Sequence, residues 1–594
     1  MEDIFKPQSL TIGELLGNKD ALYQIPRYQR PYSWGEDQLD KLWSDLVDAQ
    51  HSEPNYFLGS VITAKPEDVS NYLDVVDGQQ RLTTLIILIS VCRDLYPNIN
   101  EDILESNPFA IDGTIVKSSI KLNDRFERLR LKTHSNHESD FQDLIIKDGK
   151  SILNKRPFKK DLRIEQAPHF KFMNASIFFK EKLEELGEKA TGLFINYLFN
   201  SVKIIRIDCQ SVSFAIKLFQ VLNDRGLDLS NSDLIKSFLI GKIHKIYEHD
   251  ADLKRQYEDR FMDDWKSCEI IAIDTEESMN NLFVMFEYFL LEKNPEKSLY
   301  DELKRLFELR NPNDVIKEFK DFITNYKYQV YHSKDTVIYS LYYLRWSVYW
   351  RTIVTTAIYV NYAEIPQFLK IFRRYYYINW IAGNTLSKIK QTSFNLIGAL
   401  KRQDSIEIIR DELEKQLKKE NTVEKAVINL NGDIYFEQWC KPLLFMIEYQ
   451  QQENAYFFKM DDRTIQTEHI LPKAYKSSEG WEYIDELVAV SEWINSGANL
   501  TLLSGSKNLN ARNYKYSRKV QSYDGTGLED INDKKVTSFN ITQRLVNDYN
   551  ANKFNKEWNI DSINNRWIWF CEQVEKMLEI NLTDNKKMLL MKKN

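Results

Sequence analysis

A glutamate, a histidine and a proline stand close together in TEHILPKAY, residues 467–475. The intrinsic pKa of imidazole lies near neutral pH, so His469 suits a general base that activates water. The Glu468 carboxylate offers an oxygen ligand to a hard divalent cation. Hydrolysis of a phosphodiester needs both groups, because a base must activate water while a cation holds the phosphate. A lone histidine at a strand end is more often structural, so the surrounding elements must decide.

The elements around this stretch follow a strand, strand, helix order. RTIQTEHIL, residues 463–471, predicts a strand that runs into a loop, and NLTLLS, residues 499–504, predicts a second strand. KNLNARNYKYSRKVQSY, residues 507–523, predicts a helix that carries Asn508 near its start. Between them, WEYIDELVAVSEWIN predicts a further helix. This order would add a second oxygen ligand, Asn508, to the site, whereas the alternative interpretation makes the asparagines ordinary caps.

Basic residues follow the second predicted strand. Five of them and no acid occur between Lys507 and Lys519. Such a run is usually a solvated helix face, but its place beside His469 favours contact with a nucleic-acid backbone. The net charge of −7 argues against indiscriminate coating of nucleic acid, although a local basic patch is sufficient for binding. The residues expected to contact DNA are Lys507, Arg512, Asn513, Lys515 and Lys519.

Two strings near the amino terminus indicate a second site. In VVDGQQRLTTL, residues 75–85, Asp77 and Gly78 lie between a predicted strand and the start of a helix. Gly78 permits a tight turn, and free amides at a helix start can receive a phosphate. Arg81 in the first turn could grip that phosphate, and IPRYQRPYSW, residues 25–34, adds further donors. Alone, an Asp-Gly turn is more often structural.

The remaining pattern predicts the elements that carry these strings. Strands are expected in YFLGSVITAK, NYLDVVDG and VKIIRIDCQ, and helices in TIGELL and QQRLTTLIILISVCRDLY. Ser33 and Glu36 fit a capping box for the helix SWGEDQLDKLWSDLVDAQ. Ser230 fits the cap of a helix that follows a glycine-containing turn.

At 594 residues the chain is too long for one hydrophobic core, and three domains are expected. Their predicted ranges are 1–245, 246–454 and 455–594. Abundant Tyr and Phe with scarce Gly and Pro favour long helices, so the fold class is α+β and mostly helical. The middle range is helical and aromatic without a catalytic constellation, which indicates a linker or recognition domain whose aromatics pack in the core.

The cysteines and the apolar runs bear on location. The five cysteines are widely spaced and form no zinc clip or disulfide framework, which fits a reducing cytoplasm. The first 25 residues contain acids and no long apolar run, so no signal peptide is expected. The most apolar run, LTTLIILISVC, is about half the length that spans a bilayer. A protein without membrane contact is expected.

The carboxyl-terminal strings EHILP and ANLTLLSGSKNLNARNYKYSRK resemble the HNH, or ββα-metal, nuclease fold. Ala498 departs from the glycine that is usual there. The resemblance implies that His469 is the general base and that Glu468 and Asn508 hold one Mg²⁺ or Mn²⁺. It also implies that Asn499 fixes the loop that carries the histidine. Asn510 lies two positions from Asn508, so the second ligand could be displaced by two residues.

Together with YFLGSVI and FQVLNDRGLDLSNSDLIKSFL, the amino-terminal strings resemble the GmrS/GmrD-type, modification-dependent (type IV) restriction endonucleases. The resemblance covers residues 1–240 and 455–560 approximately. It implies a ParB/sulfiredoxin-like amino-terminal domain that binds and hydrolyses a nucleoside triphosphate (GTP, UTP, CTP or ATP). The nucleotide-binding residues that it implies are Arg27, Gln29, Arg30, Asp77, Gly78, Gln79, Gln80, Arg81, Asn223 and Gly226.

The expected function is an NTP-dependent, metal-dependent DNA endonuclease of bacterial antiphage defence that restricts DNA with hydroxymethylated or glucosylated cytosine. Two alternatives stay open. One is a nucleotide-sensing switch protein whose HNH fold only clamps DNA, and the other is an abortive-infection nuclease that acts on host nucleic acid. One HNH site cuts one strand per encounter, so a homodimer is also an open option.

Overall fold

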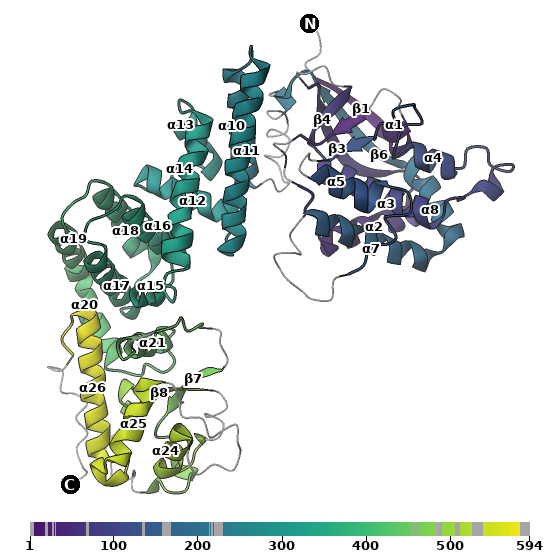
Figure 1. Cartoon of the computed structure of the whole chain (residues 1–594). Helices are drawn as coiled ribbons and strands as arrows, with labels where there is room; N and C mark the ends of the chain where they lie inside the picture. Colours follow the sequence, from purple (N-terminus) through teal and green to yellow (C-terminus); the bar gives the residue numbers. More distant parts are fainter. Residues whose placement is uncertain are drawn as a thin grey trace. The chain divides into compact units, whose positions relative to one another are not determined.

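The structure is a computed structural model of the chain (Figure 1). It describes residues 5–17, 22–26, 29, 31–66, 71–133, 137–156, 168–212, 214–215, 218, 230–452, 455–460, 464–482, 484, 490–504, 511–525 and 539–582. The fold is α+β and mostly helical, as the composition predicts. Two units can be separated, one of residues 1–269 and 303–317 and the other of residues 270–302 and 318–594.

The first unit contains a mixed six-stranded sheet in the order β1-β6-β3-β4-β2-β5. Its strands are β1 (Phe5–Thr11), β2 (Leu22–Gln24), β3 (Tyr56–Ala64), β4 (Tyr72–Asp77), β5 (Leu131–Lys132) and β6 (Val202–Cys209). Strand β3 runs parallel to β6 and antiparallel to β4, while β1 runs antiparallel to β6. The three strands that the sequence predicts, β3, β4 and β6, are confirmed and occupy the middle of the sheet.

The helices of this unit bury their apolar faces around the long helix α3 (Gln79–Leu95), which packs against α7 (Figure 1). The apolar run LTTLIILISVC lies inside α3 and forms part of the hydrophobic core. Apolar residues recur every three to four positions along the neighbouring helices, so each helix turns an apolar stripe toward the same core. The other described α-helices that precede β6 are α1 (Ile12–Gly17), α2 (Glu36–Ser52), α4 (Gly113–Ser118), α5 (Glu138–Phe141), α7 (Pro168–Leu186) and α8 (Glu188–Asn200).

The predicted capping box of α2 is wrong. The helix begins at Glu36 after Gly35, and the Gln38 carboxamide oxygen accepts the Gly35 N–H at 2.9 Å. The Ser33 N–H instead donates to the Gln80 side chain at 2.9 Å. Glu36 is therefore the first residue of the helix and cannot reach back as the third residue of a capping box does.

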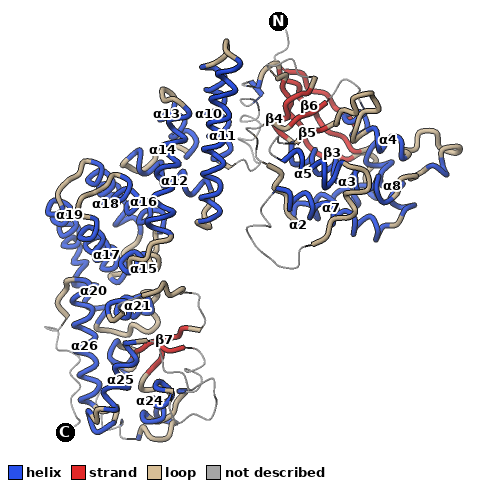
Figure 2. Tube along the Cα trace, in the orientation of Figure 1, coloured by secondary structure: helices blue, strands red, loops and turns tan. Residues whose placement is uncertain are grey.

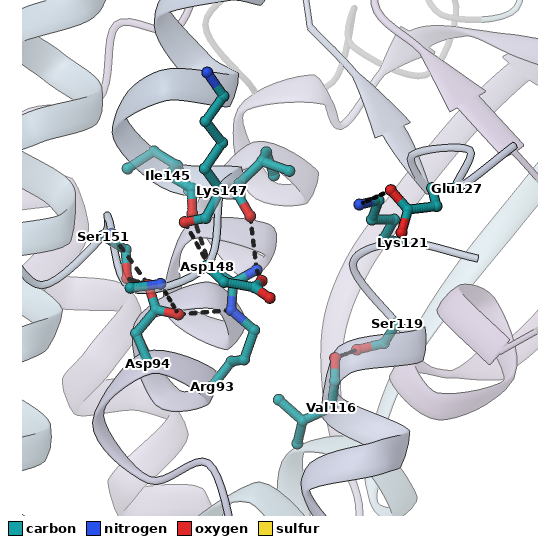
Figure 3. Close-up of polar contacts among 12 residues, drawn as sticks. Arg93, Asp94, Val116, Ser119, Lys121, Glu127, Ile145, Lys147, Asp148 and Ser151 are labelled. Carbon is teal, nitrogen blue, oxygen red and sulfur yellow. Dashed lines mark hydrogen bonds and ion pairs between the residues drawn. The ribbon is translucent and has the colours of Figure 1, made fainter. Parts of the chain in front are cut away.

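A buried arginine at the end of α3 binds a segment that lies more than 50 positions later in the chain (Figure 3). Arg93 donates to carbonyl oxygens at the end of the π-helix η3 (Gln142–Ile146), including that of Ile145 at 3.3 Å. The neighbouring Asp94 accepts from the Arg93 Nε at 2.7 Å and from the Ser151 hydroxyl at 2.7 Å. Charge-assisted hydrogen bonds thus satisfy the free carbonyls of a helix end and fix this segment on α3.

The chain then continues as helices, as the sequence predicts. The cap at Ser230 is confirmed, because its hydroxyl accepts the Asp233 N–H at 3.2 Å. Many aromatic side chains of this part, such as Tyr376 and Tyr377, are fully buried, which confirms their packing role. Each described helix of the chain is too short or too polar to span a bilayer. The elements are α10 (Asn231–Ile246), α11 (Ala251–Asp274), α12 (Met279–Leu291), α13 (Leu299–Phe307), α14 (Pro312–Asn325), the π-helix η4 (Tyr326–Tyr331), α15 (Thr336–Leu341), α16 (Ser347–Tyr359), α17 (Ile365–Ile381), α18 (Leu386–Lys401), α19 (Ile406–Lys418), α20 (Thr422–Leu430) and α21 (Cys440–Gln450).

A two-stranded antiparallel sheet lies among helices near the carboxyl end (Figure 2). Its strands β7 (Ile465–His469) and β8 (Leu500–Ser504) occur where the sequence predicts them, with Glu468 opposite Thr501. The helix that follows, α24 (Tyr516–Asp524), is shorter than predicted. The surrounding helices are α22 (Val490–Trp493), α25 (Asn540–Asn550) and α26 (Ile560–Leu578).

The late start of α24 has a local cause. Arg512 has a positive φ of 34°, and Lys515 is extended and precedes the first helical residue. A residue with positive φ interrupts a right-handed helix, so the chain turns at residues 512–513 and stays non-helical up to residue 515. The strand, strand, helix order matches the expectation, and its assignment to the HNH fold stays a prediction.

Candidate functional site

Glu468 and His469 are the last two residues of β7, and both are buried. Successive side chains of a strand point to opposite faces, so the two residues meet different partners. The Lys519 ammonium connects them, since it donates to Glu468 Oε1 at 2.6 Å and to the backbone oxygen of His469 at 2.6 Å. The carboxylate and the imidazole therefore belong to one cluster although they face different ways.

A short chain of hydrogen bonds holds the imidazole. His469 Nε2 lies 2.9 Å from Asn495 Oδ1, and Asn495 Nδ2 donates to Asp433 Oδ2 at 3.0 Å. An ionised carboxylate only accepts hydrogen bonds, so Asp433 turns the amide nitrogen of Asn495 toward itself and the amide oxygen toward the ring. Nε2 must then carry the proton, and this assigns the lone pair to Nδ1.

The surroundings of the ring favour its neutral form. The pKa of His469 is lowered to about 4, mainly by burial and to a smaller extent by Lys473 and Lys519, while the Asn495 hydrogen bond opposes this shift. The Tyr435 ring lies against the imidazole with the two centroids 4.2 Å apart. A neutral imidazole with a free Nδ1 has the protonation state that a general base needs at neutral pH.

Asn499 ties the loop after His469 to the start of β8. Its carboxamide oxygen accepts the Leu471 N–H at 2.7 Å, and its amide nitrogen donates to the Leu471 carbonyl at 2.9 Å and to the Ile494 carbonyl at 2.8 Å. The side chain is fully buried. With donor and acceptor both used, this asparagine fixes the backbone two residues after the histidine.

Lys519 lies in the interior, whereas the sequence pattern predicts it at the DNA. Its side chain is 1% exposed, and it forms an ion pair with Glu468. Tyr523 adds a hydrogen bond to the same carboxylate oxygen at 3.3 Å. Burial raises the pKa of Glu468, and the Lys519 ammonium opposes that rise. The reason for the difference is the helix phase of α24, which turns Lys519 inward with Tyr523, one helical turn later.

The other predicted DNA contacts divide into described and undescribed residues. Arg512, Asn513 and Lys515 are exposed and lie in the turn before α24. Lys507 and Asn508, together with Asn510, lie outside the described residues. An exposed basic turn next to the buried cluster could follow a phosphate backbone, since such contacts need mobile cationic side chains more than fixed geometry.

The donors that the structure describes suit a hard cation only in part. Within the described ranges, no group of three or more His, Cys, Asp and Glu side chains is placed to hold a metal. Glu468 supplies one carboxylate, and the hydrogen bonds from Lys519 and Tyr523 both go to its Oε1. A carboxylate whose one oxygen is fixed in this way is a preorganised oxygen donor of the type that Mg²⁺ and Mn²⁺ prefer. The second predicted ligand, Asn508, is outside the described residues.

The sequence gives no signal for three residues of this cluster. Asp433, Tyr435 and Asn495 come from segments with no motif, and Asp433 precedes His469 by 36 positions. The backbone joins these segments too, because the Ile434 and Tyr435 N–H groups both donate to the Asn495 carbonyl. Such long-range pairs depend on tertiary packing, which local sequence patterns do not report.

The amino-terminal site lies where β4 ends and α3 begins. Gly78 has a φ of 85°, and a Cβ there would meet Val61 Cγ2 at 2.7 Å and the Ser60 carbonyl oxygen at 3.0 Å. Only glycine fits this turn, which presses the start of α3 against β3. The N–H groups of the first helical turn have no partner inside the helix and remain available to an anion.

Gln79 contributes an unsatisfied acceptor to the same place. Its side chain is 7% exposed, and its Oε1 is buried without a hydrogen-bond partner among the described residues. Gln29 lies in a bend, and its side chain donates to the carbonyl of Val76 on β4 at 2.7 Å. A buried polar atom without a partner costs stability, so its presence at a helix start fits a ligand that would satisfy it.

Arg81 is directed along β3. Its Nη1 donates to the Ser60 carbonyl at 2.8 Å, and a Cβ on Gly59 would come within 2.5 Å of that nitrogen. Gly59 has a φ of 117° at an irregularity in the pairing of β3 with β6, which opens room for the guanidinium. Burial raises the pKa of Asp77, and Arg81 opposes that rise. Gln80 fastens the loop at Ser33, as described for α2.

The structure therefore gathers six of the predicted nucleotide-binding residues at one end of the sheet. These are Gln29, Asp77, Gly78, Gln79, Gln80 and Arg81. The other four, which lie outside the described residues, are Arg27, Arg30, Asn223 and Gly226.

Two family models match this chain. The first, described as GmrSD restriction endonuclease, N-terminal domain, matches residues 12–240. The second, described as GmrSD restriction endonucleases, C-terminal domain, matches residues 402–573 and so includes Asp433, His469 and Asn495. A comparison with curated proteins finds no match. The two matches cover both of the clusters described above.

Proposed function

Because the chain belongs to the GmrSD restriction endonuclease family, we propose that it cleaves DNA at the His469 cluster with His469 as the general base. The observation that carries this proposal is the neutral, oriented imidazole, whose Nε2 lies 2.9 Å from Asn495 Oδ1 and whose Nδ1 has no hydrogen-bond partner among the described residues. In this role Nδ1 takes a proton from the water that attacks the phosphorus.

The other residues of the cluster position these groups. Asn499 fixes the loop after the histidine, and Lys519 holds Glu468 beside it. Glu468 and Asn508 would hold one Mg²⁺ or Mn²⁺, which when bound would stabilise the negative charge that develops on the phosphate. The exposed Arg512 and Lys515 would contact the DNA backbone.

We infer further that the amino-terminal domain binds a nucleoside triphosphate and Mg²⁺ and controls cleavage. The support is the glycine turn at the start of α3, where a helix leaves its first amides without an internal partner, and the Gln79 acceptor, which lacks a partner among the described residues. Hydrolysis of the bound nucleotide would give the domain two states, as in other nucleotide-controlled switches. The DNA to be cut would carry hydroxymethylated or glucosylated cytosine, in keeping with the resemblance to modification-dependent enzymes.

A cleavage assay tests this function. The purified chain is incubated with unmodified, hydroxymethylated and glucosylated DNA, with and without Mg²⁺ and each of GTP, UTP, CTP and ATP. We expect cuts only in modified DNA and only when metal and nucleotide are both present. Equal cleavage without nucleotide would overturn the control step, and absence of cleavage in every mixture would overturn the nuclease itself.

The Asn495 side chain offers a test of the imidazole geometry. In Asn495→Ala the ring loses the acceptor that fixes its tautomer, so we expect kcat for DNA cleavage to fall by roughly 10- to 100-fold. The Asn495 hydrogen bond raises the pKa of His469, so the acid limb of the pH–rate profile is expected to stay low or move lower. Asp433→Ala should lower kcat less, because Asn495 itself remains. An unchanged kcat in Asn495→Ala would contradict this orientation.

The Gln79 side chain offers a test of the nucleotide site. Replacement of a buried acceptor that lacks a partner by an apolar group of similar shape is neutral or stabilising. Gln79→Met is therefore expected to keep or raise the melting temperature of the free protein while removing the stabilisation by nucleotide. Gln50→Met on α2 is the matched control and should retain the nucleotide-dependent shift. A Gln79→Met protein with the full shift would exclude Gln79 from the nucleotide site.

A further inference from the structure

A cavity lies in the helical part of the second unit, and it is lined by residues other than those of the His469 cluster. Its volume is about 660 Å³, and it is lined by residues 275–277, 331–334, 339, 342, 343, 351, 457, 459 and 460. Cavities that bind small molecules usually measure about 300–1,000 Å³. The size therefore suits a nucleotide with its base, sugar and phosphate.

The walls of this cavity are aromatic. Phe457 packs against both Tyr339 and Tyr342, with ring centroids 5.5 Å apart in each case. Tyr331 lines the cavity from the end of the π-helix η4, an irregular helix type that is often found at functional sites. Flat aromatic side chains around one space favour a flat ring as the occupant, because stacking on them is tolerant of the identity of a base.

The walls also contain a charged pair. Arg351 forms an ion pair with Glu277, yet its Nε is buried without a hydrogen-bond partner among the described residues. Asn281 holds the second oxygen of Glu277 at 3.1 Å, which fixes the ion pair in place. The fixed Arg351–Glu277 pair gives the wall a polar edge that can meet the polar edge of a ring.

Cations surround the entrance. Lys334 and Lys459 are exposed and line the cavity, as does His332, while Glu276 is the one acid there besides the paired Glu277. Two exposed ammonium groups beside an aromatic chamber fit a phosphate attached to a flat ring. The charges thus point to an anionic, ring-bearing ligand.

We propose that this cavity binds a nucleotide unit, with the base against the aromatic wall that contains Tyr342 and Phe457 and the phosphate at Lys334 and Lys459. The unit is either a free nucleotide or a nucleotide turned out of a DNA duplex, which share this chemistry. The second source rests on the proposed action of the protein on DNA. An extruded base in an aromatic pocket would let the helical part examine a base edge that the duplex hides.

The test uses the full chain without divalent cation, so that cleavage is absent. Titration calorimetry measures binding of nucleoside 5′-monophosphates, and fluorescence follows 2-aminopurine placed in a mismatch of a DNA duplex. The double variant Lys334→Glu/Lys459→Glu changes only exposed side chains and should fold normally. Tyr342→Ala removes one wall, and Lys415→Glu on the exposed side of α19 is the matched control.

Loss of stacking on one aromatic side chain typically weakens base binding by about 5- to 150-fold, so we expect at least a tenfold loss in Tyr342→Ala. The lysine double variant should lose a similar factor, and Lys415→Glu should bind as the parent protein does. Loss confined to the monophosphates identifies a free nucleotide as the ligand, and loss confined to the 2-aminopurine signal identifies an extruded base. Binding of both ligands that is the same in the lysine double variant and in Lys415→Glu would overturn the proposal.

The outcome is independent of the catalytic cluster. A His469→Ala protein that no longer cuts DNA is expected to keep the cavity-dependent binding. If the parent protein cuts DNA and the lysine double variant binds both ligands normally, the cavity proposal is refuted and the nuclease proposal is not. Nucleotide held by the amino-terminal domain is the same in parent and variant, so it cancels in the comparison.

Discussion

Replacement of His469 by alanine is expected to lower the rate of DNA cleavage by roughly 10²–10⁴-fold, the range that general acid–base groups contribute. The variant removes the neutral imidazole that Asn495 and Asp433 orient, and no neighbouring group in the described cluster can replace Nδ1 as a base. Lys519 is tied to Glu468, and Tyr523 donates to the same carboxylate. The measurement is the single-turnover rate on modified DNA with metal and nucleotide present.

The controls separate loss of chemistry from loss of fold or of DNA binding. His249→Ala changes an exposed histidine that lies outside both clusters, and it should cleave at the parental rate. His469→Ala should still bind modified DNA with nearly parental affinity. Retention of full cleavage would exclude His469 as the general base, and full phage protection by His469→Ala would support the rival view that this fold clamps DNA without cutting it.

The low pKa of His469 sets the pH dependence. Since its pKa is about 4, the imidazole stays neutral down to acid pH, and the acid limb of kcat/KM is expected well below the usual histidine value of about 6.5. The same shift affects stability. A base whose folded-state pKa is depressed contributes stability that is present above its unfolded-state pKa and is lost as the pH falls from about 6.5 toward 4.

Local sequence patterns predict the strands β7 and β8 because their apolar alternation and flanking turns are local signals. The same holds for β3, β4 and α3, whose apolar residues are contiguous in the chain. The tie between Asn499 and the loop after His469 agrees with the role that the family resemblance implies. These features need no knowledge of distant segments.

Other features depend on contacts that the sequence does not announce. Asp433 lies 62 positions before Asn495, just after α20, and only the tertiary fold brings the two side chains together. In the sequence, Lys519 is one of five basic residues and is predicted to be exposed. Its burial depends on the start of α24 at Tyr516, because that start determines which side chains of the helix face the interior. The strand order β1-β6-β3-β4-β2-β5 likewise joins residues up to 204 positions apart, as in the pairing of Phe5 with Cys209.

Replacement of Lys519 by methionine is expected to destabilise the structure around β7 by about 3–5 kcal/mol, the usual cost of leaving one member of a buried ion pair without its partner. Methionine keeps the volume of the side chain but leaves the Glu468 carboxylate buried without its ammonium partner, with the Tyr523 hydroxyl and the His469 backbone N–H as donors. Because the chain has two units, scanning calorimetry should be combined with hydrogen exchange of the β7 and β8 amides, which report the affected part directly.

The pH dependence and a second variant decide whether the ion pair is the cause. Burial already raises the pKa of Glu468, and loss of Lys519 raises it further. A carboxyl whose folded-state pKa is raised contributes stability that is fully present below its unfolded-state pKa, about 4.3, and is lost as the pH rises through the folded-state value. The deficit of Lys519→Met is therefore expected to shrink as the pH falls toward about 4.3, and Lys519→Met/Glu468→Gln should recover most of it at pH values near neutral. A deficit that stays constant with pH and persists in the double variant would show that Lys519 acts by packing alone. In that case the carboxylate beside His469 would not depend on this ammonium for its position, and its preorganisation as an oxygen donor would need another source.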